Sequence, residues 1–357
     1  MDFIPGENLE ECLKKWTKNG EADGPRMCDL VYEQLAEMMW QLYRHKFDRI
    51  GSITKTPEGQ WVITKRPMTL DMQRQAFGVP GFPVETWPTG PLLRSQDYKA
   101  MVVDQLQYQL EHLRNLNIPV ELDRKTGHYV QWENTDMARA MDVARGRFIA
   151  RRAFATSAAT SFHDDGDDGP FVIFNSDFCP RNMLVNPETA EITALVDFEF
   201  TNTMPASFAH DPPPWLLPIV LDKTLDLDLF PWWQQEYQDA VDRFLAAMER
   251  VEARQQEQQQ ADHDPPLSAL MRASWNSKQC LVNFAFHHSD TVDAIYWAIP
   301  EKFREPNWES LLEVEVEAYQ AFTKVQIDAY KKGGVAKEGR KSSRSLTNDM
   351  GTIIADP

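Results

Sequence analysis

The sequence lacks any apolar run long enough to cross a membrane. Nowhere in its 357 residues does such a run reach the roughly 18 residues that a membrane-spanning helix needs. Asp2 and Pro5 also interrupt the first residues, where a secretory signal would carry its apolar segment. We therefore expect a cytoplasmic protein without a membrane partner.

Cysteine and basic residues are also scarce. The four cysteines, Cys12, Cys28, Cys179 and Cys280, lie far apart without a C-x-x-C pattern, which predicts reduced thiols and no structural zinc. There are 37 Lys and Arg against 54 Asp and Glu, a net charge of −17. This balance argues against a nucleic-acid partner, which would need clustered positive charge. It would suit a cationic small substrate, although an acidic surface can equally serve solubility.

Glycine-rich phosphate loops are absent as well. No G-x-G-x-x-G and no G-x-x-x-x-G-K-[ST] pattern occurs, so no such loop offers its backbone N–H groups to phosphates. The nearest imitation is a predicted hairpin over residues 53–65, which turns at Pro57-Glu58-Gly59 and ends in Lys65. A lone glycine cannot form the turn that covers phosphates in kinases, so we interpret the segment as a surface hairpin.

The remaining pattern is that of a mostly helical chain with a sizeable core, since 42% of its residues are hydrophobic. Apolar residues at helical spacing predict helices over residues 25–47, 96–116, 135–155, 231–260, 267–286 and 308–330. The Pro- and Gly-containing range 67–91 predicts an ordered excursion over the surface, and the acidic range 163–169 a solvated loop without the order of an EF-hand. The polar range 333–357 predicts a disordered tail.

The most informative segment, residues 171–200, reads FVIFNSDFCPRNMLVNPETAEITALVDFEF. Short β-rich runs at 171–174, 183–185 and 192–196, with a turn at 186–189, put the polar residues on loops at strand ends. Asp177 follows the first run, Asn182 comes five residues later, and Asp197 ends the last run. In kinase-type catalysis an Asp meets the attacking hydroxyl, while an Asn five residues on and a later Asp bind Mg²⁺.

This segment resembles the aminoglycoside phosphotransferase and choline kinase family of protein-kinase-like enzymes, whose loop reads H-x-D-x-x-x-x-N before a strand and an Asp-x-Glu. Asp197-Phe198-Glu199 matches the last element. Residues 197–217, Ser274-Trp275 and Ile295-Tyr296-Trp297 are similar to the large fungal branch, and the resemblance extends to about residue 325.

The resemblance implies an α+β, mostly α fold: the C-terminal lobe of a kinase-like enzyme over residues 1–332, with small β-hairpins. Its catalytic core is residues 171–217, and residues 1–6 resemble the hinge at which such a lobe begins. It implies transfer of the γ-phosphoryl of ATP to a small-molecule hydroxyl, with Asp177 orienting the hydroxyl and Asn182 and Asp197 holding Mg²⁺.

Two features depart from the family. Asn175 stands where the family has a His that braces the loop, which affects positioning more than chemistry. The small lobe, with its glycine-rich loop and phosphate-binding Lys, is not found before the hinge-like residues 1–6. We therefore expect a weak or inactive kinase on its own, through either a lost first exon or true loss of the lobe. A pseudokinase-type binding or regulatory module, or a catalyst of other chemistry, remains an alternative.

Several other residues are candidates with plainer interpretations beside the functional one. Glu199 is either a second-shell acceptor or a surface group, and Arg181 either meets a phosphate or pairs with a carboxylate. His287 and His288 are interpreted as structural, and Cys179 has nothing that marks it as a nucleophile. Proline and aromatic residues that suit an acceptor cleft, or that pack under an irregular loop, are Pro212, Pro213, Pro214, Trp215, Trp232 and Trp233.

Overall fold

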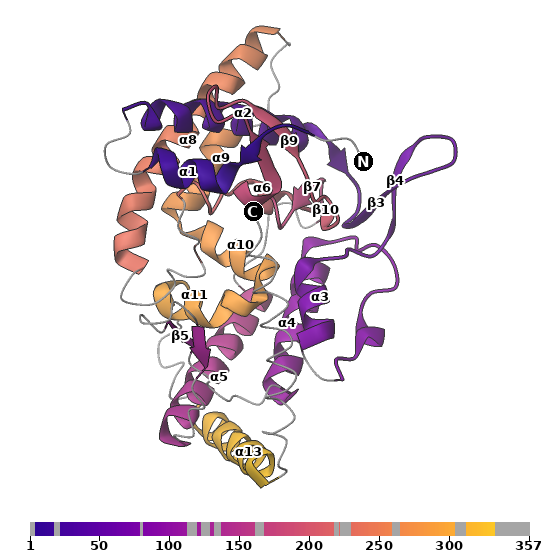
Figure 1. Cartoon of the computed structure of the whole chain (residues 1–357). Coiled ribbons are helices and arrows are strands. Elements are labelled where there is room, and N and C mark those ends of the chain that lie inside the picture. The colour runs from indigo at the N-terminus through magenta and orange to yellow at the C-terminus, as the bar shows by residue number, and fades with distance from the viewer. Residues whose placement is uncertain are drawn as a thin grey trace. The chain divides into compact units, whose positions relative to one another are not determined.

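The chain is a mixture of helices and strands in which helices dominate (Figure 1). The computed structural model describes residues 4–17, 22–78, 81–112, 120–122, 129–131, 137–160, 168–217, 221, 230–258, 265–303 and 312–332. The chain divides into two compact units. The first unit is Met1–Gln109 with Phe154–Phe303, and the second is Leu110–Ala153 with Arg304–Pro357. In the part described, no helix is long and apolar enough to span a membrane.

The first unit contains every candidate residue named above. Its strands are β1 (Glu7–Asn8), β2 (Lys46–Phe47), β3 (Gly51–Lys55), β4 (Trp61–Lys65), β7 (Phe171–Asn175), β8 (Met183–Val185), β9 (Ile192–Leu195) and β10 (Thr201–Pro205). Its helices are α1 (Leu9–Trp16), α2 (Gly24–Arg44), α3 (Leu70–Gly78), α6 (Ala206–Ala209), α8 (Phe230–Gln258), α9 (Leu267–Asn276), α10 (Gln279–His287) and α11 (Val292–Ala298). Helix α4 (Ser95–His112) begins in this unit.

A five-stranded antiparallel sheet has the order β2-β7-β10-β3-β4. Strand β10 pairs with all of β7, from Thr201 opposite Asn175 to Pro205 opposite Phe171, and its other edge pairs with β3. Strands β3 and β4 form a hairpin that extends away from the sheet in Figure 1. The sheet therefore fixes two chain segments. One is the end of β7, where the loop at residues 176–182 that contains Asp177 and Asn182 (the candidate loop) begins, and the other is the start of β10, which follows Asp197.

A second, three-stranded sheet has the order β1-β8-β9 and carries the other end of the candidate loop. The hinge-like segment approaches it closely, since the Thr193 hydroxyl donates to the Pro5 carbonyl at 2.8 Å. Gly6, at φ +150°, leaves no room for a Cβ atom, which would lie 2.7 Å from the Thr193 Oγ1. The side chain of Asn8 donates to the Arg181 carbonyl at 2.8 Å. Residues 5–8 are thus tied directly to the candidate loop.

Helices α2 and α8 lie side by side and form the largest helical contact of the first unit (Figure 1). Pro25 near the start of α2 matches the fixed φ that a first helical turn needs, and the buried positions of α2 recur at helical spacing. Tyr32 meets Phe244 edge-on at 6.1 Å and donates from its hydroxyl to the Leu216 carbonyl at 2.6 Å. This contact holds the Pro-rich segment before residue 217 against α2.

The second unit contains most of helix α5 (Met137–Thr160), whose end lies in the first unit. It also contains α13 (Glu313–Lys332) and a two-stranded sheet of β5 (Val120–Leu122) and β6 (Tyr129–Gln131). Phe148 stacks on Tyr319 at 5.0 Å, and the Tyr319 hydroxyl donates to the Leu110 carbonyl at 2.8 Å. Arg152 pairs with Glu315 at 3.3 Å. None of the candidate residues lies in this unit.

The helices predicted at 25–47, 96–116, 135–155 and 231–260 are confirmed as α2, α4, α5 and α8, and the one predicted at 308–330 is described as α13. The single helix predicted at 267–286 is wrong. It is two helices, α9 and α10, because Lys278 between them adopts a left-handed conformation at φ 59°.

Other outcomes concern loops and strands. The hairpin and the three predicted strands are confirmed, whereas the excursion at 67–91 contains the unpredicted helix α3. Strand β10 was not predicted either. The tail at 333–357 and most of the acidic loop at 163–169 lie outside the described residues. The single lobe over residues 1–332 stays a prediction.

Candidate functional site

The candidate loop connects β7 to β8 through a short 3-10 turn at Pro180–Asn182. Its first bend is closed by Asn175, whose side-chain oxygen accepts from the backbone N–H of Asp177 at 2.7 Å. The backbone N–H of Phe178 donates to the Asn175 carbonyl at 3.2 Å. An Asn side chain that hydrogen-bonds two residues ahead stabilises a tight turn. The turn places Asp177 immediately after the end of the strand.

Asn182 holds the Asp177 side chain in place. The Asn182 Nδ2 donates to both the backbone carbonyl and the carboxylate Oδ2 of Asp177, each at 2.9 Å. Both donors of the amide are therefore used on one residue. The amide oxygen, Oδ1, has no hydrogen-bond partner among the residues that the structure describes, so it is free to accept a ligand.

Asp197 follows β9, and its backbone lies beside the same loop. The carbonyl of Asp197 accepts from the Asn175 Nδ2 at 3.3 Å, and the N–H of Val196 donates to the Asn182 carbonyl at 2.9 Å. Asp197 has a φ of +65°, which an L residue other than Asn or Asp rarely adopts. Its carboxylate is exposed and makes no hydrogen bond or ion pair within the described part of the chain. The structure thus joins the backbones of the three candidates, while only Asp177 and Asn182 touch through side chains.

Asn182 and Asp197 carry the type of ligand atom that a divalent cation prefers. Mg²⁺ takes oxygen ligands, typically one or two from protein with the rest from water and phosphate. The Asn182 Oδ1 and the Asp197 carboxylate are two such oxygens on adjoining backbone segments. In the described residues, neither this site nor any other contains a group of three or more His, Cys, Asp or Glu side chains that could hold a metal ion.

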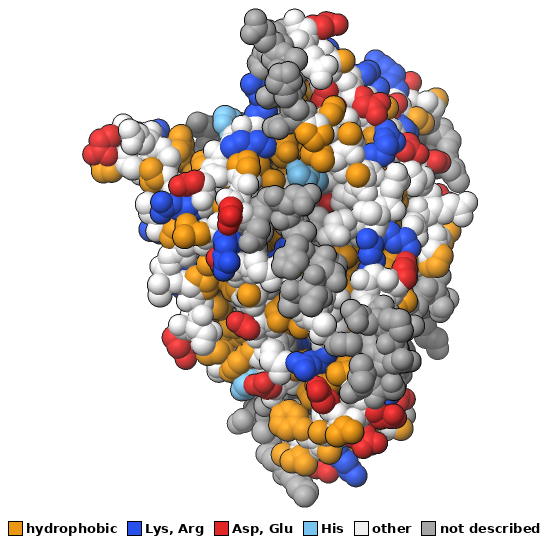
Figure 2. Space-filling view, turned by 180° about the vertical axis from the view of Figure 1, so that it is seen from behind, with side chains coloured by type: hydrophobic (Ala, Val, Ile, Leu, Met, Phe, Trp, Pro, Cys, Tyr) orange, Lys and Arg blue, Asp and Glu red, His pale blue; other side chains and the backbone are white. Residues whose placement is uncertain are grey.

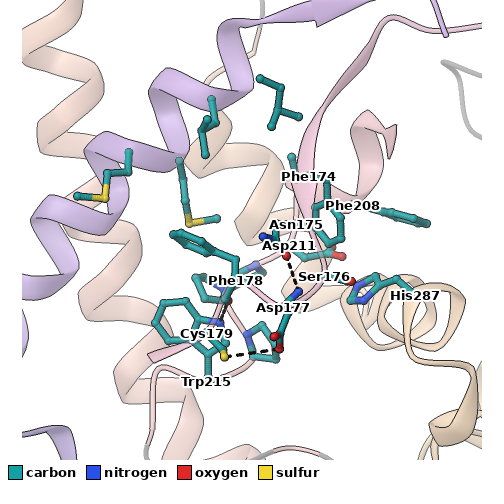
Figure 3. A pocket seen from close by; sticks show the side chains of 18 of the residues that line it. Phe174, Asn175, Ser176, Asp177, Phe178, Cys179, Phe208, Asp211, Trp215 and His287 are labelled. Carbon is teal, nitrogen blue, oxygen red and sulfur yellow. Dashed lines mark hydrogen bonds between the residues drawn. The ribbon is translucent and has the colours of Figure 1, made fainter. Parts of the chain in front are cut away.

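A cavity of about 1180 Å³ lies beside Asp177. Figure 3 shows Asp177 in its wall, with Phe178 and Trp215 to one side and Phe208 and His287 to the other. The other walls come from α2, β7, α8 and α10, and most of the lining side chains are apolar or aromatic. Asn182 and Asp197 do not line this cavity. Asp177 therefore lines the cavity and also contacts Asn182, one of the two candidate ligands of a cation.

Three polar features of the cavity were not predicted. Asp211 accepts from the Ser274 hydroxyl at 2.5 Å and from the Asn283 Nδ2 at 3.1 Å, which connects the segment at 197–217 to α9 and α10. The hydroxyl of Ser176 is shielded from solvent and has no partner among the described residues. The Nδ1 atoms of His287 and His288 share a hydrogen bond of 2.7 Å. The partners of Asp211 are remote in sequence, so spacing alone could not reveal them.

Burial sets the electrostatics of this region. It lowers the pKa of His287 well below the usual range and the pKa of His288 to about 3, so both rings are neutral near pH 7. Burial, and then the charge of Asp177, raises the pKa of the Cys179 thiol. The structural interpretation of the histidines is therefore supported, and Cys179 has the opposite of the lowered pKa that a nucleophile needs.

The weaker candidate residues lie at the surface or in the cavity wall. Glu199 is exposed, as a surface group would be. Arg181 lies 4.0 Å from Glu10, which favours its interpretation as a partner of a carboxylate. Trp232 is 47% exposed and lies outside the cavity. The cavity is lined by Pro212, Pro213, Pro214, Trp215 and Trp233.

No family model, no curated protein and no solved structure matches this chain. The family resemblance therefore depends on the residues quoted for it.

Proposed function

We propose that the first unit is the large lobe of a kinase-like phosphotransferase, of the aminoglycoside phosphotransferase type, that moves the γ-phosphoryl of ATP to the hydroxyl of a small molecule. The observation that carries this proposal is the double hydrogen bond from Asn182 to Asp177. It fixes the carboxylate that would meet the hydroxyl and leaves the amide oxygen without a partner among the described residues. A fixed carboxylate beside a cation site is what phosphoryl transfer requires, because positioning and charge stabilisation supply nearly all of its catalysis.

Asp177 is assigned the role of orienting the acceptor. Its Oδ2 is occupied by Asn182, while its Oδ1 has a long contact of 3.7 Å from the Cys179 thiol. An incoming hydroxyl can donate to this carboxylate in place of the weak thiol donor. Asn175 acts on the reaction only through the backbones of Asp177 and Asp197, so we assign it a positioning role.

Asn182 and Asp197 are assigned to Mg²⁺. The Asn182 Oδ1 and the Asp197 carboxylate would hold the ion, which when bound to ATP neutralises charge on its phosphates. No glycine-rich loop occurs in the sequence to share that task, so we expect slow turnover.

Calorimetry with ATP and Mg²⁺ tests the proposal. We expect heat that requires both ATP and the ion and that is lost in Asp197→Asn. The matched control is Glu188→Gln, which removes an exposed carboxylate in the turn between β8 and β9 and should change nothing. If the heat persists without Mg²⁺, or in Asp197→Asn, the assigned cation site is wrong.

A second candidate is a pseudokinase-type module that binds ATP without catalysis. The exposed carboxylate of Asp197 favours it, because none of the residues that the structure describes holds this carboxylate toward the site. Release of labelled phosphate, or its transfer to an alcohol, distinguishes the two. Binding heat without any transfer leaves the second candidate.

Location and partners belong to the same proposal. We place the protein in the cytoplasm, where ATP is available, and assign it no nucleic-acid or membrane partner. Figure 2 shows acidic and basic side chains interspersed over the face drawn, as expected for a surface that does not bind a polyanion.

A further inference from the structure

The walls of the cavity beside Asp177 are made of large apolar side chains. Met38, Met39 and Leu42 come from α2, Phe174 from the end of β7, and Phe178 from the candidate loop. Covering such side chains with apolar surface lowers the free energy of the complex, whereas a sugar hydroxyl or an ammonium group placed against them brings no such stabilisation.

Aromatic rings stiffen one side of the cavity. Trp233 stacks on Tyr237 with ring centroids 4.4 Å apart, and Trp275 meets Tyr237 at 5.3 Å. Trp215 packs edge-on against Phe178 at 5.9 Å, next to Asp177. Preformed aromatic walls of this kind suit a flat, ring-bearing ligand, since they lose little freedom when it binds.

The charges on the lining do not suit a polycation. Three carboxylates line the cavity, Glu10, Asp177 and Asp211, and Asp211 is already engaged by Ser274 and Asn283. The lining also contains three cations, Arg44, Lys46 and Arg181. An aminoglycoside carries several ammonium groups, and each would need an anionic partner to replace its hydration.

Two residues of the lining each carry a polar atom that is shielded from solvent and has no partner among the described residues. One such atom is the indole N–H of Trp233, a residue only 1% exposed, and the other is the hydroxyl of Ser176, next to Asp177. A buried donor without a partner costs free energy, which a ligand oxygen can recover. The lining therefore accommodates a mainly apolar molecule that carries a few oxygen atoms.

From these observations we infer that the acceptor is a largely apolar, ring-bearing alcohol or phenol, and not a polycationic aminosugar. This inference rests on the proposed function only in that Asp177 meets the reacting hydroxyl. The ring system lies against the apolar and aromatic walls, and a second oxygen accepts from the Trp233 N–H. In the transfer, the bond between the γ-phosphorus of ATP and its bridging oxygen breaks and ADP leaves, a bond from the γ-phosphorus to the acceptor oxygen forms, and the hydroxyl proton passes to the Asp177 carboxylate.

Binding is tested without ATP, so the result does not depend on phosphoryl transfer. Calorimetry compares 2,6-dihydroxynaphthalene, a two-ring diol, with neomycin, a polycationic polyol. We expect saturable binding of the diol and no detectable heat from neomycin.

Three variants locate the binding site. Met39→Lys places a charge in the apolar wall and should weaken diol binding at least tenfold. Trp233→Phe keeps the ring but removes the donor, and should weaken binding about three- to tenfold. The matched control is Phe77→Lys on α3, at a position 86% exposed and outside the cavity, which should leave binding unchanged. Should Met39→Lys fail to melt cooperatively, Trp233→Phe alone decides.

The outcomes separate this inference from the proposed function. Diol binding that is lost in the cavity variants supports an apolar acceptor, even if no phosphate is transferred. Neomycin binding without diol binding overturns the inference, and so does diol binding that is unaffected by Met39→Lys and Trp233→Phe. Heat from Mg²⁺ and ATP, measured separately, judges the proposed function in every case.

Discussion

The side-chain amide of Asn175 donates to the backbone carbonyl of Asp197 at 3.3 Å, so one residue links the two loops of the candidate site. The same amide also donates to the Thr201 hydroxyl at 3.1 Å, while the Asn175 oxygen accepts from the Asp177 N–H. The resemblance places a bracing His at this position. Asn175 connects both loops through its own shorter side chain.

Asn175→Ala should loosen both loops at once. The loss of three hydrogen bonds should lower the free energy of unfolding by about 1–3 kcal/mol, and any phosphoryl transfer should fall in kcat more than it rises in KM. Asn186→Ala is the matched control, since Asn186 closes the surface turn after β8 in the same way. That variant should lose stability but keep its activity. Equal effects of both variants on kcat would contradict a positioning role for Asn175.

Because the backbone of Asp197 is left-handed, we predict that substitutions at this position can change stability and ligand binding independently. Asp197→Asn keeps a residue that tolerates φ +65° and should fold normally, whereas Asp197→Val should cost about 1–3 kcal/mol of folding free energy. Both variants should lose binding of ATP with Mg²⁺. Chemical denaturation and calorimetry measure the two effects. A Val variant as stable as the wild type would show that the conformation is not strained.

We predict that Asp71, near the start of α3, lowers the free energy of unfolding as pH rises. Its carboxylate is buried and accepts from the Ser289 N–H, and burial raises its pKa from 3.8 to about 6. Between these values the folded state keeps a proton that the unfolded state has released, so stability falls as pH rises from about 4 to 6. The loss is on the order of 2–3 kcal/mol. Asp71→Asn, which cannot ionise, should remove this dependence in urea titrations at several pH values. An unchanged pH profile would refute the assignment to Asp71.

The buried histidines predict the opposite dependence. Because burial lowers the pKa values of His287 and His288, the unfolded state binds protons below pH 6.5 that the folded state does not, and stability falls as pH drops. His288→Phe should keep the stacking on Phe284, now at 4.3 Å, and flatten the acid side of the profile. Comparison of urea midpoints at pH 7 and pH 4.5 checks this. A variant with the same acid slope as the wild type would contradict it.

We predict that close packing at Gly6 is needed for the hinge-like segment, residues 1–6, to stabilise the fold. In Gly6→Ala the added methyl group would meet Thr193 and strain the φ of +150°, so we expect a cost of about 1–3 kcal/mol. The control is Gly78→Ala at the end of α3, where a Cβ meets nothing within 4 Å. Thermal melting should separate the two variants. Similar melting temperatures would mean that residues 5–8 contribute little to the first unit.

Much of the helical fold was predictable from the sequence, because burial on one face imposes helical spacing, as in α2 and α8. The break at Lys278 was not, since a Lys carries no turn signal and adopts its positive φ only in the folded chain. Strand β10 was missed for a similar reason. Its sequence, TNTMP, has little strand character, and pairing with β7 and β3 on both edges defines it.

The candidate site was likewise predictable from the sequence only in part. The spacing of Asp177, Asn182 and Asp197 is local in sequence and was visible. The Pro- and Trp-rich part of the cavity lining was one of two interpretations of residues 212–215 and 232–233. The other walls were not predictable, because they bring α2 together with residues more than 100 positions later, and no local pattern records that packing. That the Ser176 hydroxyl and the Trp233 N–H lack a partner among the described residues follows from tertiary packing, which no local pattern records.

The position of β10 between β7 and β3 has a consequence for the order of folding. Residues 51–55 cannot join the sheet until residues 201–205 have been synthesised, and these in turn pair with residues 171–175. Closing such long chain loops is entropically costly and slow. During translation the early hairpin must therefore wait, with its edge uncovered, for about 150 further residues to leave the ribosome.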